Sequence, residues 1–212
     1  MERLRTIIQT SSDVITGKTT LMLKILIATG ALTVGLTAPQ IPNATEAPEI
    51  QPLPVIPYEA SWKCEDCSPE EQYVLEQLQE HTRISDRNAL ATIMGNIKQE
   101  SKFISNICEG GARVSYRDCT RGGYGLIQWT SIGRYNNLGK FCTNFGCDPS
   151  TLEGQTRYMI NESVFQRYLP EFEGPGKTVD QYMVPAYYWL GWGIKGNRQL
   201  YAYDYVNKLK LM

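Results

Sequence analysis

The stretch of residues 96–130 contains the side chains with the strongest chemical signal. Its first part, residues 96–103, is predicted to end a helix and carries a single carboxylate, Glu100. Its second part, residues 123–130, is rich in glycine and is predicted to form a tight turn or hairpin that carries the amide of Gln128. We expect the two parts to form two walls of one cleft.

The position of Glu100 on its helix favours a role as a general acid. Apolar residues precede it at helical spacing: Leu90, Ile93, Met94 and Ile97. Glu100 lies on the flank of this buried face, at the C-terminal end of the helix. Apolar surroundings and the negative end of the helix dipole both disfavour a carboxylate, so we expect a raised pKa, as proton donation near neutral pH requires. The alternative is an exposed glutamate paired with Lys98 or Lys102.

Two motifs in this stretch resemble those of a known superfamily. Residues 100–103, Glu-Ser-Lys-Phe, are followed by residues 125–128, Gly-Leu-Ile-Gln. The pair is similar to the Glu-Ser-x-Phe and Gly-Leu-Met-Gln motifs of the lysozyme and lytic transglycosylase superfamily. The longer strings at residues 95–101 and 124–130 resemble the phage tail lysozyme family of peptidoglycan hydrolases. The resemblance extends roughly over residues 89–205 and is dense only around the two motifs.

The resemblance implies a reaction and a set of site residues. Glu100 matches the catalytic acid of the superfamily. The positions that match acid-orienting or substrate-binding residues are Ser101, Tyr124, Gln128, Trp129 and, in a late aromatic segment, Tyr188. The implied act is cleavage of the β-1,4 bond between N-acetylmuramic acid and N-acetylglucosamine, with peptidoglycan glycan strands as the partner. The resemblance implies neither a cofactor nor a metal.

A second catalytic carboxylate is not evident. Glycosidases usually use two carboxylates, and their separation sets the stereochemical outcome. Glu109 and Asp118, in the predicted loop between the motifs, are the candidates. Lytic transglycosylases work with one acid/base, and the 6-hydroxyl of the substrate is the nucleophile. Hydrolysis and anhydro-forming cleavage therefore both remain open.

Six cysteines lie in the predicted domain: Cys64, Cys67, Cys108, Cys119, Cys142 and Cys147. Six cysteines allow 15 pairings. Pairing of sequence neighbours would close three loops, although the short Cys64–Cys67 spacing leaves another partner open for either residue. Disulfides imply an oxidising compartment. A zinc site is the alternative, but the irregular spacings and the single histidine weigh against it.

Other classes of function compete with the glycosidase hypothesis. The domain could be a catalytically inactive glycan-binding or virion structural module, although the intact Glu100 and Ser101 argue against this. It could instead cleave wall peptides, with Cys108 or Cys142 as nucleophile beside His81, but no local signature supports it. A formal net charge of −1, from 21 basic and 22 acidic residues, shows no basic footprint for nucleic acid.

The first 60 residues are predicted to lie outside the folded domain. Residues 25–38 carry no charge and follow a basic segment, which is typical of a signal peptide. An uncleaved membrane anchor is also open, because including residues 21–24 lengthens the segment toward the ~20 residues that span a bilayer. A buried helix of a soluble protein is the third alternative. Residues 39–60 hold six of the eleven prolines and are predicted to form an extended linker. We expect residues 1–38 to place the domain outside the cytoplasm, secreted, membrane-anchored or virion-associated.

The remaining residues, 61–212, are predicted to form one mostly α-helical, lysozyme-like domain (α+β) with a small β-hairpin region lining the cleft. Ser68 to Glu71 form a capping box that should start a helix ending near His81. A second helix should begin after Ser85 or Asp86. Further helices are expected at residues 131–145, from the capping box at 150–153, at 179–190 and at 197–209. Oligomeric state is not indicated.

Overall fold

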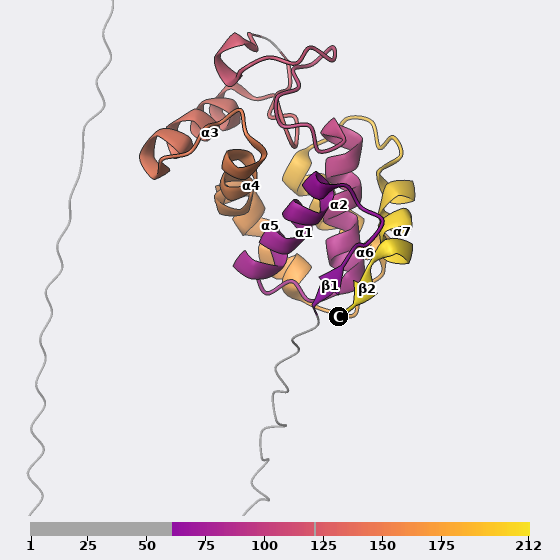
Figure 1. Ribbon diagram of the computed structural model, residues 1–212. Helices are drawn as coiled ribbons and strands as arrows, with labels where there is room; N and C mark the ends of the chain where they lie inside the picture. Colours follow the sequence, from indigo (N-terminus) through magenta and orange to yellow (C-terminus); the bar gives the residue numbers. More distant parts are fainter. Residues whose placement is uncertain (1–60, 121) are drawn as a thin grey trace, which may run out of the picture. The chain divides into compact units, whose positions relative to one another are not determined.

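A computed structural model describes residues 61–120 and 122–212. The predicted signal peptide or anchor (1–38) and linker (39–60) lie outside the described residues. The described part is mostly helical, with seven α-helices, one 3-10 helix and a two-stranded antiparallel sheet, which confirms the predicted fold class (Figure 1). None of these helices is long and apolar enough to cross a membrane.

The elements follow one another in this order: β1 (Trp62–Lys63), α1 (Pro69–His81), α2 (Arg87–Ser101), the 3-10 helix η1 (Tyr116–Asp118), α3 (Ile132–Phe145), α4 (Leu152–Asn161), α5 (Ser163–Glu173), α6 (Val179–Leu190), α7 (Arg198–Lys208) and β2 (Lys210–Leu211).

Local capping chemistry explains where the first two helices begin. The Ser68 hydroxyl accepts from the backbone N–H of Glu71, and the Glu71 carboxylate accepts from the N–H of Ser68, which completes the predicted capping box of α1. Asp86 caps α2 by accepting from the N–H groups of Asn88 and Ala89. The predicted starts of both helices are therefore confirmed, and α2 carries Glu100 in its last turn.

Helix α2 is the centre of the domain (Figure 1). It packs against α1, α5, α6 and α7, and residues 89–97 are buried without interruption, so burial is not confined to the one face that the spacing predicted. Gly95 explains the close approach of α7, because a Cβ at this position would overlap the backbone of Ala202. The end of α2 that carries Glu100 is thereby held from several sides.

The sequence predicted a β-hairpin region that lines the cleft. The two-stranded sheet lies elsewhere. Strands β1 and β2 pair Trp62 with Leu211, so the sheet joins the two ends of the described domain. The segments around the glycine-rich turn form only isolated bridges, one of them between Cys108 and Tyr124. Extended pairing stops there because the chain turns back at once, with the N–H of Trp129 donating to the carbonyl of Tyr124 at 3.0 Å.

The middle of the chain differs from the prediction at one helix boundary. Thr151, rather than Ser150, caps α4, and its hydroxyl accepts from the N–H of Gly154. Helix α5 was not predicted as a separate helix. Glu162 ends α4 and is also the N-cap residue of α5, so the chain changes direction at a buried carboxylate.

All six cysteines form disulfides between sequence neighbours: Cys64–Cys67, Cys108–Cys119 and Cys142–Cys147. The described residues therefore contain no free cysteine. This overturns the hypothesis of a cysteine nucleophile at Cys108 or Cys142, because neither carries a thiolate. His81, its suggested partner, is exposed at the end of α1.

Candidate active site

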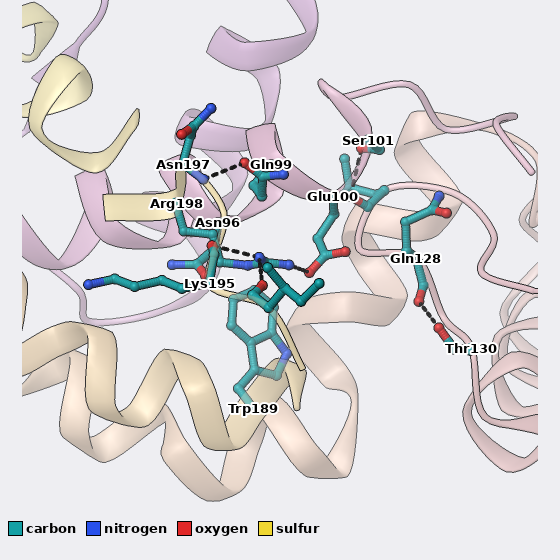
Figure 2. Close-up of polar contacts among 12 residues, drawn as sticks. Asn96, Gln99, Glu100, Ser101, Gln128, Thr130, Trp189, Lys195, Asn197 and Arg198 are labelled. Carbon is teal, nitrogen blue, oxygen red and sulfur yellow. Dashed lines mark hydrogen bonds and ion pairs between the residues drawn. The ribbon is translucent and has the colours of Figure 1, made fainter. Parts of the chain in front are cut away.

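The end of α2 and the glycine-rich turn lie against each other, although 25 residues separate them. The Ser101 hydroxyl donates to the backbone carbonyl of Leu126 at 2.7 Å, and both residues are buried. Figure 2 shows Ser101 directed toward this turn, while Glu100 points the other way, toward Arg198. Ser101 therefore fixes the turn relative to the helix end that carries Glu100.

The backbone is unusual at both motifs. Lys102, Phe103 and Gln128 have φ angles of 54°, 63° and 52°, and they are the only non-glycine residues with positive φ in the described part of the chain. Left-handed backbone is uncommon for such residues and costs on the order of 1–3 kcal/mol each. Such strain collects at functional sites and persists only where the surrounding structure holds it.

Gln155 of α4 is fully buried and supports the glycine-rich turn through its side-chain amide. Its Oε1 accepts from the N–H of Leu126 at 2.7 Å, and its Nε2 donates to the carbonyls of Ser105 and Pro149, each at 2.7 Å. Gly125 has a φ of 72°, and a Cβ there would overlap the Gln155 amide. The glycine is thus required both by its backbone angle and by the close approach of Gln155.

Gln128 is half-buried and its amide is directed back onto the loop. Nε2 donates to the carbonyl of Gly125 at 2.9 Å and to that of Ile107 at 3.4 Å. No described residue donates a hydrogen bond to Oε1, so this oxygen is available as an acceptor. Thr130 follows at the surface, and its hydroxyl donates to the Gln128 carbonyl at 2.8 Å.

Glu100 forms an ion pair with Arg198 at the start of α7. The two side chains are only 15% and 7% exposed. The Arg198 guanidinium also donates to the carbonyls of Ile194 and Lys195, at 2.8 and 2.9 Å, and lies 4.8 Å from the centre of the Trp192 ring. Arg198 is therefore fixed independently of Glu100 (Figure 2).

A second contact ties α2 to the same segment. The Gln99 Oε1 accepts from the N–H of Asn197 at 2.8 Å, which occupies the N-cap position of α7. Gly196 has a φ of 56°, and a Cβ there would lie 2.9 Å from the Gln99 amide. Two consecutive residues of α2, Gln99 and Glu100, thus hold the N-terminus of α7.

Opposing influences act on the Glu100 carboxyl. Burial raises its pKa, and this effect exceeds the lowering by the hydrogen bond and charge of Arg198 and by the more distant charge of Arg134. The net direction is upward, as expected from the sequence. The alternative pairing with Lys98 or Lys102 is wrong, because Arg198 is the partner and Lys98 instead lies 3.3 Å from Glu71.

Arg134 belongs to a second buried ion pair near the site. Its guanidinium makes two 2.6 Å contacts with the carboxylate of Glu162, which is 3% exposed, and donates to the carbonyl of Trp189 at 3.3 Å. This pair links α3, the α4–α5 junction and the end of α6. Sequence reasoning missed Arg198, Arg134 and Glu162, because their partners lie far along the chain.

The two candidate second carboxylates are both engaged within their own loop. Glu109 accepts from the N–H of Gly123 at 2.9 Å, which ties the loop to the glycine-rich turn. Asp118 accepts from the Ser115 hydroxyl at 2.6 Å across η1. Both are exposed, and within residues 61–120 and 122–212 neither forms a hydrogen bond or ion pair with Glu100.

The aromatic residues assigned to substrate differ in exposure. Tyr124 and Trp129 are fully buried, so they support the turn from the core and present no surface to a ligand. Trp129 packs against Tyr158 at 5.4 Å between ring centres. Tyr188 is 59% exposed on α6 and stacks on Tyr168 at 5.9 Å. Of the three, only Tyr188 has a face open to solvent.

The fold and the site define a helical, disulfide-bonded domain with one buried acid at a helix end, set against a strained glutamine-bearing turn. Residues 70–187, more than half of the chain, match the family model for phage tail lysozyme, and the chain belongs to this family. At the level of the family it is a lysozyme-type enzyme that acts on peptidoglycan. Comparison with curated proteins and with solved structures gave no match.

Proposed function

We propose that the domain cleaves the β-1,4 bond between N-acetylmuramic acid and N-acetylglucosamine, with Glu100 as the general acid. The observation that carries this proposal is the setting of Glu100. Its carboxyl is mostly buried at the end of α2, and burial raises its pKa. A carboxyl that keeps its proton near neutral pH can donate it to the leaving glycosidic oxygen.

The charges around Glu100 suit both halves of such a reaction. Before proton transfer, burial favours the protonated acid. After transfer Glu100 is a carboxylate, and Arg198 lies in place to stabilise it through their ion pair. Arg198 needs no movement, because two backbone carbonyls already hold it. The carboxylate can then accept a proton from the incoming nucleophile, either water or the substrate's own 6-hydroxyl.

The glycine-rich turn supplies the groups that would hold the glycan. Gln128 offers an unengaged Oε1 beside the helix end, and Thr130 extends the same surface. Ser101, buried below them, acts as a positioning residue through Leu126. Tyr188 is the exposed aromatic surface on which a sugar ring could pack. Tyr124 and Trp129 contribute by supporting the turn.

The proposal is tested with the oxidised full chain and its Glu100→Gln variant on purified peptidoglycan. Glutamine keeps the size of the side chain but cannot donate the acid proton, so we expect the rate of sugar release to fall by roughly 10²- to 10⁴-fold. Mass spectrometry of the products identifies the reaction, since reducing ends mean hydrolysis and 1,6-anhydro ends mean attack by the 6-hydroxyl. Equal release by both proteins would remove Glu100 from its role.

Binding without sugar release would support the alternative hypothesis of a catalytically inactive module. If neither protein releases sugars but both bind peptidoglycan equally, the domain is a glycan-binding module. The Glu100–Arg198 ion pair favours this interpretation, because it stabilises the ionised carboxylate, and an ionised carboxylate has no proton to donate. We prefer the enzyme because the chain belongs to a lysozyme family and because the net direction of the Glu100 pKa is upward despite the pair.

A further inference from the structure

One hollow of the described domain lies away from Glu100, which is not among its lining residues. It has a volume of about 940 Å³ and lies between η1, one face of α3 and the turn at residues 147–150. Its polar lining includes Arg117 of η1, Asn136, Lys140 and Asn144 of α3, and Asp148 of the turn. The catalytic proposal uses none of them.

The floor of this hollow is firmly held. The Tyr116 ring stacks on Tyr135 with 4.3 Å between centres, and its hydroxyl donates to the Tyr135 carbonyl at 2.8 Å. The N–H of Tyr116 donates to the Ser150 hydroxyl at 2.9 Å. Gly139, in the middle of α3, makes room for this ring, since a Cβ there would lie 2.6 Å from the Tyr116 hydroxyl. The hollow is therefore a built feature of the fold.

The α3 wall presents polar side chains that have no partner in the described part of the chain. Asn136, Lys140 and Asn144 are spaced four residues apart, so they follow one face of the helix. None of them, nor Arg117, makes a side-chain hydrogen bond or ion pair with another residue in 61–120 or 122–212. Asp148 is partly satisfied by the N–H of Ser150 at 2.8 Å. Arg117 and Lys140, set against the single carboxylate of Asp148, give the lining of the hollow a net positive charge.

We propose that this hollow binds an acidic peptide, namely the stem peptide that peptidoglycan carries on its muramic acid. This inference rests on the proposed function, because it takes peptidoglycan as the substrate. Arg117 and Lys140 would pair with peptide carboxylates. The primary amides of Asn136 and Asn144 can both donate to and accept from peptide groups. Asp148 offers a partner for an ammonium group of the same peptide.

The hollow shares one lining residue, Asn136, with a depression beside the glycine-rich turn. Asn136 also lines a smaller depression of about 220 Å³, whose wall includes Gly122 and Thr130. Thr130 in turn is hydrogen-bonded to Gln128. A glycan strand held at the turn would thus carry its peptide along the first turns of α3 and into the larger hollow. A glycan strand without peptides would contact only the glycine-rich turn.

Isothermal titration of the oxidised full chain tests this binding directly. The probes are a synthetic stem-type peptide with free carboxylates and the same peptide with its carboxylates amidated. We expect the acidic peptide to bind about tenfold more tightly, and Lys140→Glu to weaken its binding about tenfold, which corresponds to about 1.4 kcal/mol. Lys210→Glu, the same charge change on the exposed strand β2, should bind as the wild type does.

A second measurement separates this inference from the catalytic proposal. Lys140→Glu should release sugars from peptide-free glycan strands at the wild-type rate, but more slowly from peptide-bearing strands at low substrate concentration. If the wild type releases no sugars at all, the catalytic proposal fails while the titration still decides the hollow. Equal binding of both peptides, no binding, or unchanged binding by Lys140→Glu would overturn the peptide site.

Discussion

At the scale of single residues, the role proposed for Glu100 places two opposing requirements on its carboxyl. A general acid must keep its proton until the substrate is in place and must then release it readily. Burial serves the first requirement by raising the pKa, and Arg198 serves the second by lowering it. Arg198 lies outside the span that matches the family model, which ends at residue 187. The balance therefore depends on a residue that the match does not cover.

Replacing Arg198 should move the pH dependence of activity in a defined direction. In Arg198→Gln the lowering influence is lost, so the pKa of Glu100 rises further and the acid stays protonated to higher pH. We expect the alkaline limb of the kcat/KM profile to shift upward. We also expect kcat to fall on the order of 10²-fold, because the carboxylate formed on proton transfer loses its counter-charge.

The conservative variant separates this electrostatic role from a structural one. Arg198→Lys keeps the positive charge, so its alkaline limb should lie closer to that of the wild type even if its kcat is reduced. Both variants are compared at a temperature where circular dichroism shows them folded. An alkaline limb that stays in place in Arg198→Gln would mean that the ion pair only holds α7 against α2.

At the scale of elements, the site is a meeting point of α2, the glycine-rich turn, α4 and α7. Ser101 ties the turn to α2, Gln155 ties it to α4, and the Gln99 and Glu100 side chains tie α2 to α7. Each tie is made by a side chain bonded to backbone or to charge. The position of Gln128 therefore depends on residues that never touch it.

Gln155→Leu tests the support that α4 gives to the turn. Leucine has a similar size but satisfies neither the N–H of Leu126 nor the carbonyls of Ser105 and Pro149. A buried polar group without a partner costs about 1–3 kcal/mol, so we expect the free energy of unfolding to fall by at least ~2 kcal/mol. Urea denaturation measures this loss, and sugar release by the folded fraction should fall as well.

The matched control is Gln166→Leu, on α5. Gln166 is exposed, and its amide makes one bond, to the carbonyl of Ile160, and none to the turn. It should lose less stability and keep its activity. If Gln155→Leu unfolds no more easily than this control, or retains full activity, α4 does not hold the turn in place.

The sequence predicted the elements better than the contacts between them. The starts of α1 and α2 follow from Ser68 and Asp86, because capping is local and depends on residues two or three positions apart. The pairing of Glu100 with Arg198 spans 98 residues, and Gln155 lies 29 residues from Leu126. No local pattern marks such pairs. The burial of Tyr124 and Trp129 was missed for the same reason, since it depends on packing from several helices.

At the scale of the whole described domain, its two ends are joined. Strands β1 and β2 pair Trp62 with Leu211 and Lys63 with Lys210, and the N–H of Met212 donates to the carbonyl of Ser61 at 2.9 Å. Trp62 is held further by donating its ring N–H to the carbonyl of Ser85 at 2.8 Å. Chain ends that are tied down in this way resist fraying. Because α1 follows β1 and α7 precedes β2, the pairing also links two of the helices that pack against α2.

Removing residues 210–212 should lower stability without changing the chemistry. The truncation eliminates β2 and the bond from Met212, and a few backbone hydrogen bonds at about 0.5–1.5 kcal/mol each predict a loss of roughly 1–3 kcal/mol in the free energy of unfolding. Thermal and urea unfolding measure it. Lys210→Glu, which keeps the backbone pairing, should unfold like the wild type. Since Glu100 and Arg198 contact neither strand, kcat at a temperature where the protein is folded should be unchanged, and a reduced kcat there would show that the joined ends also shape the site.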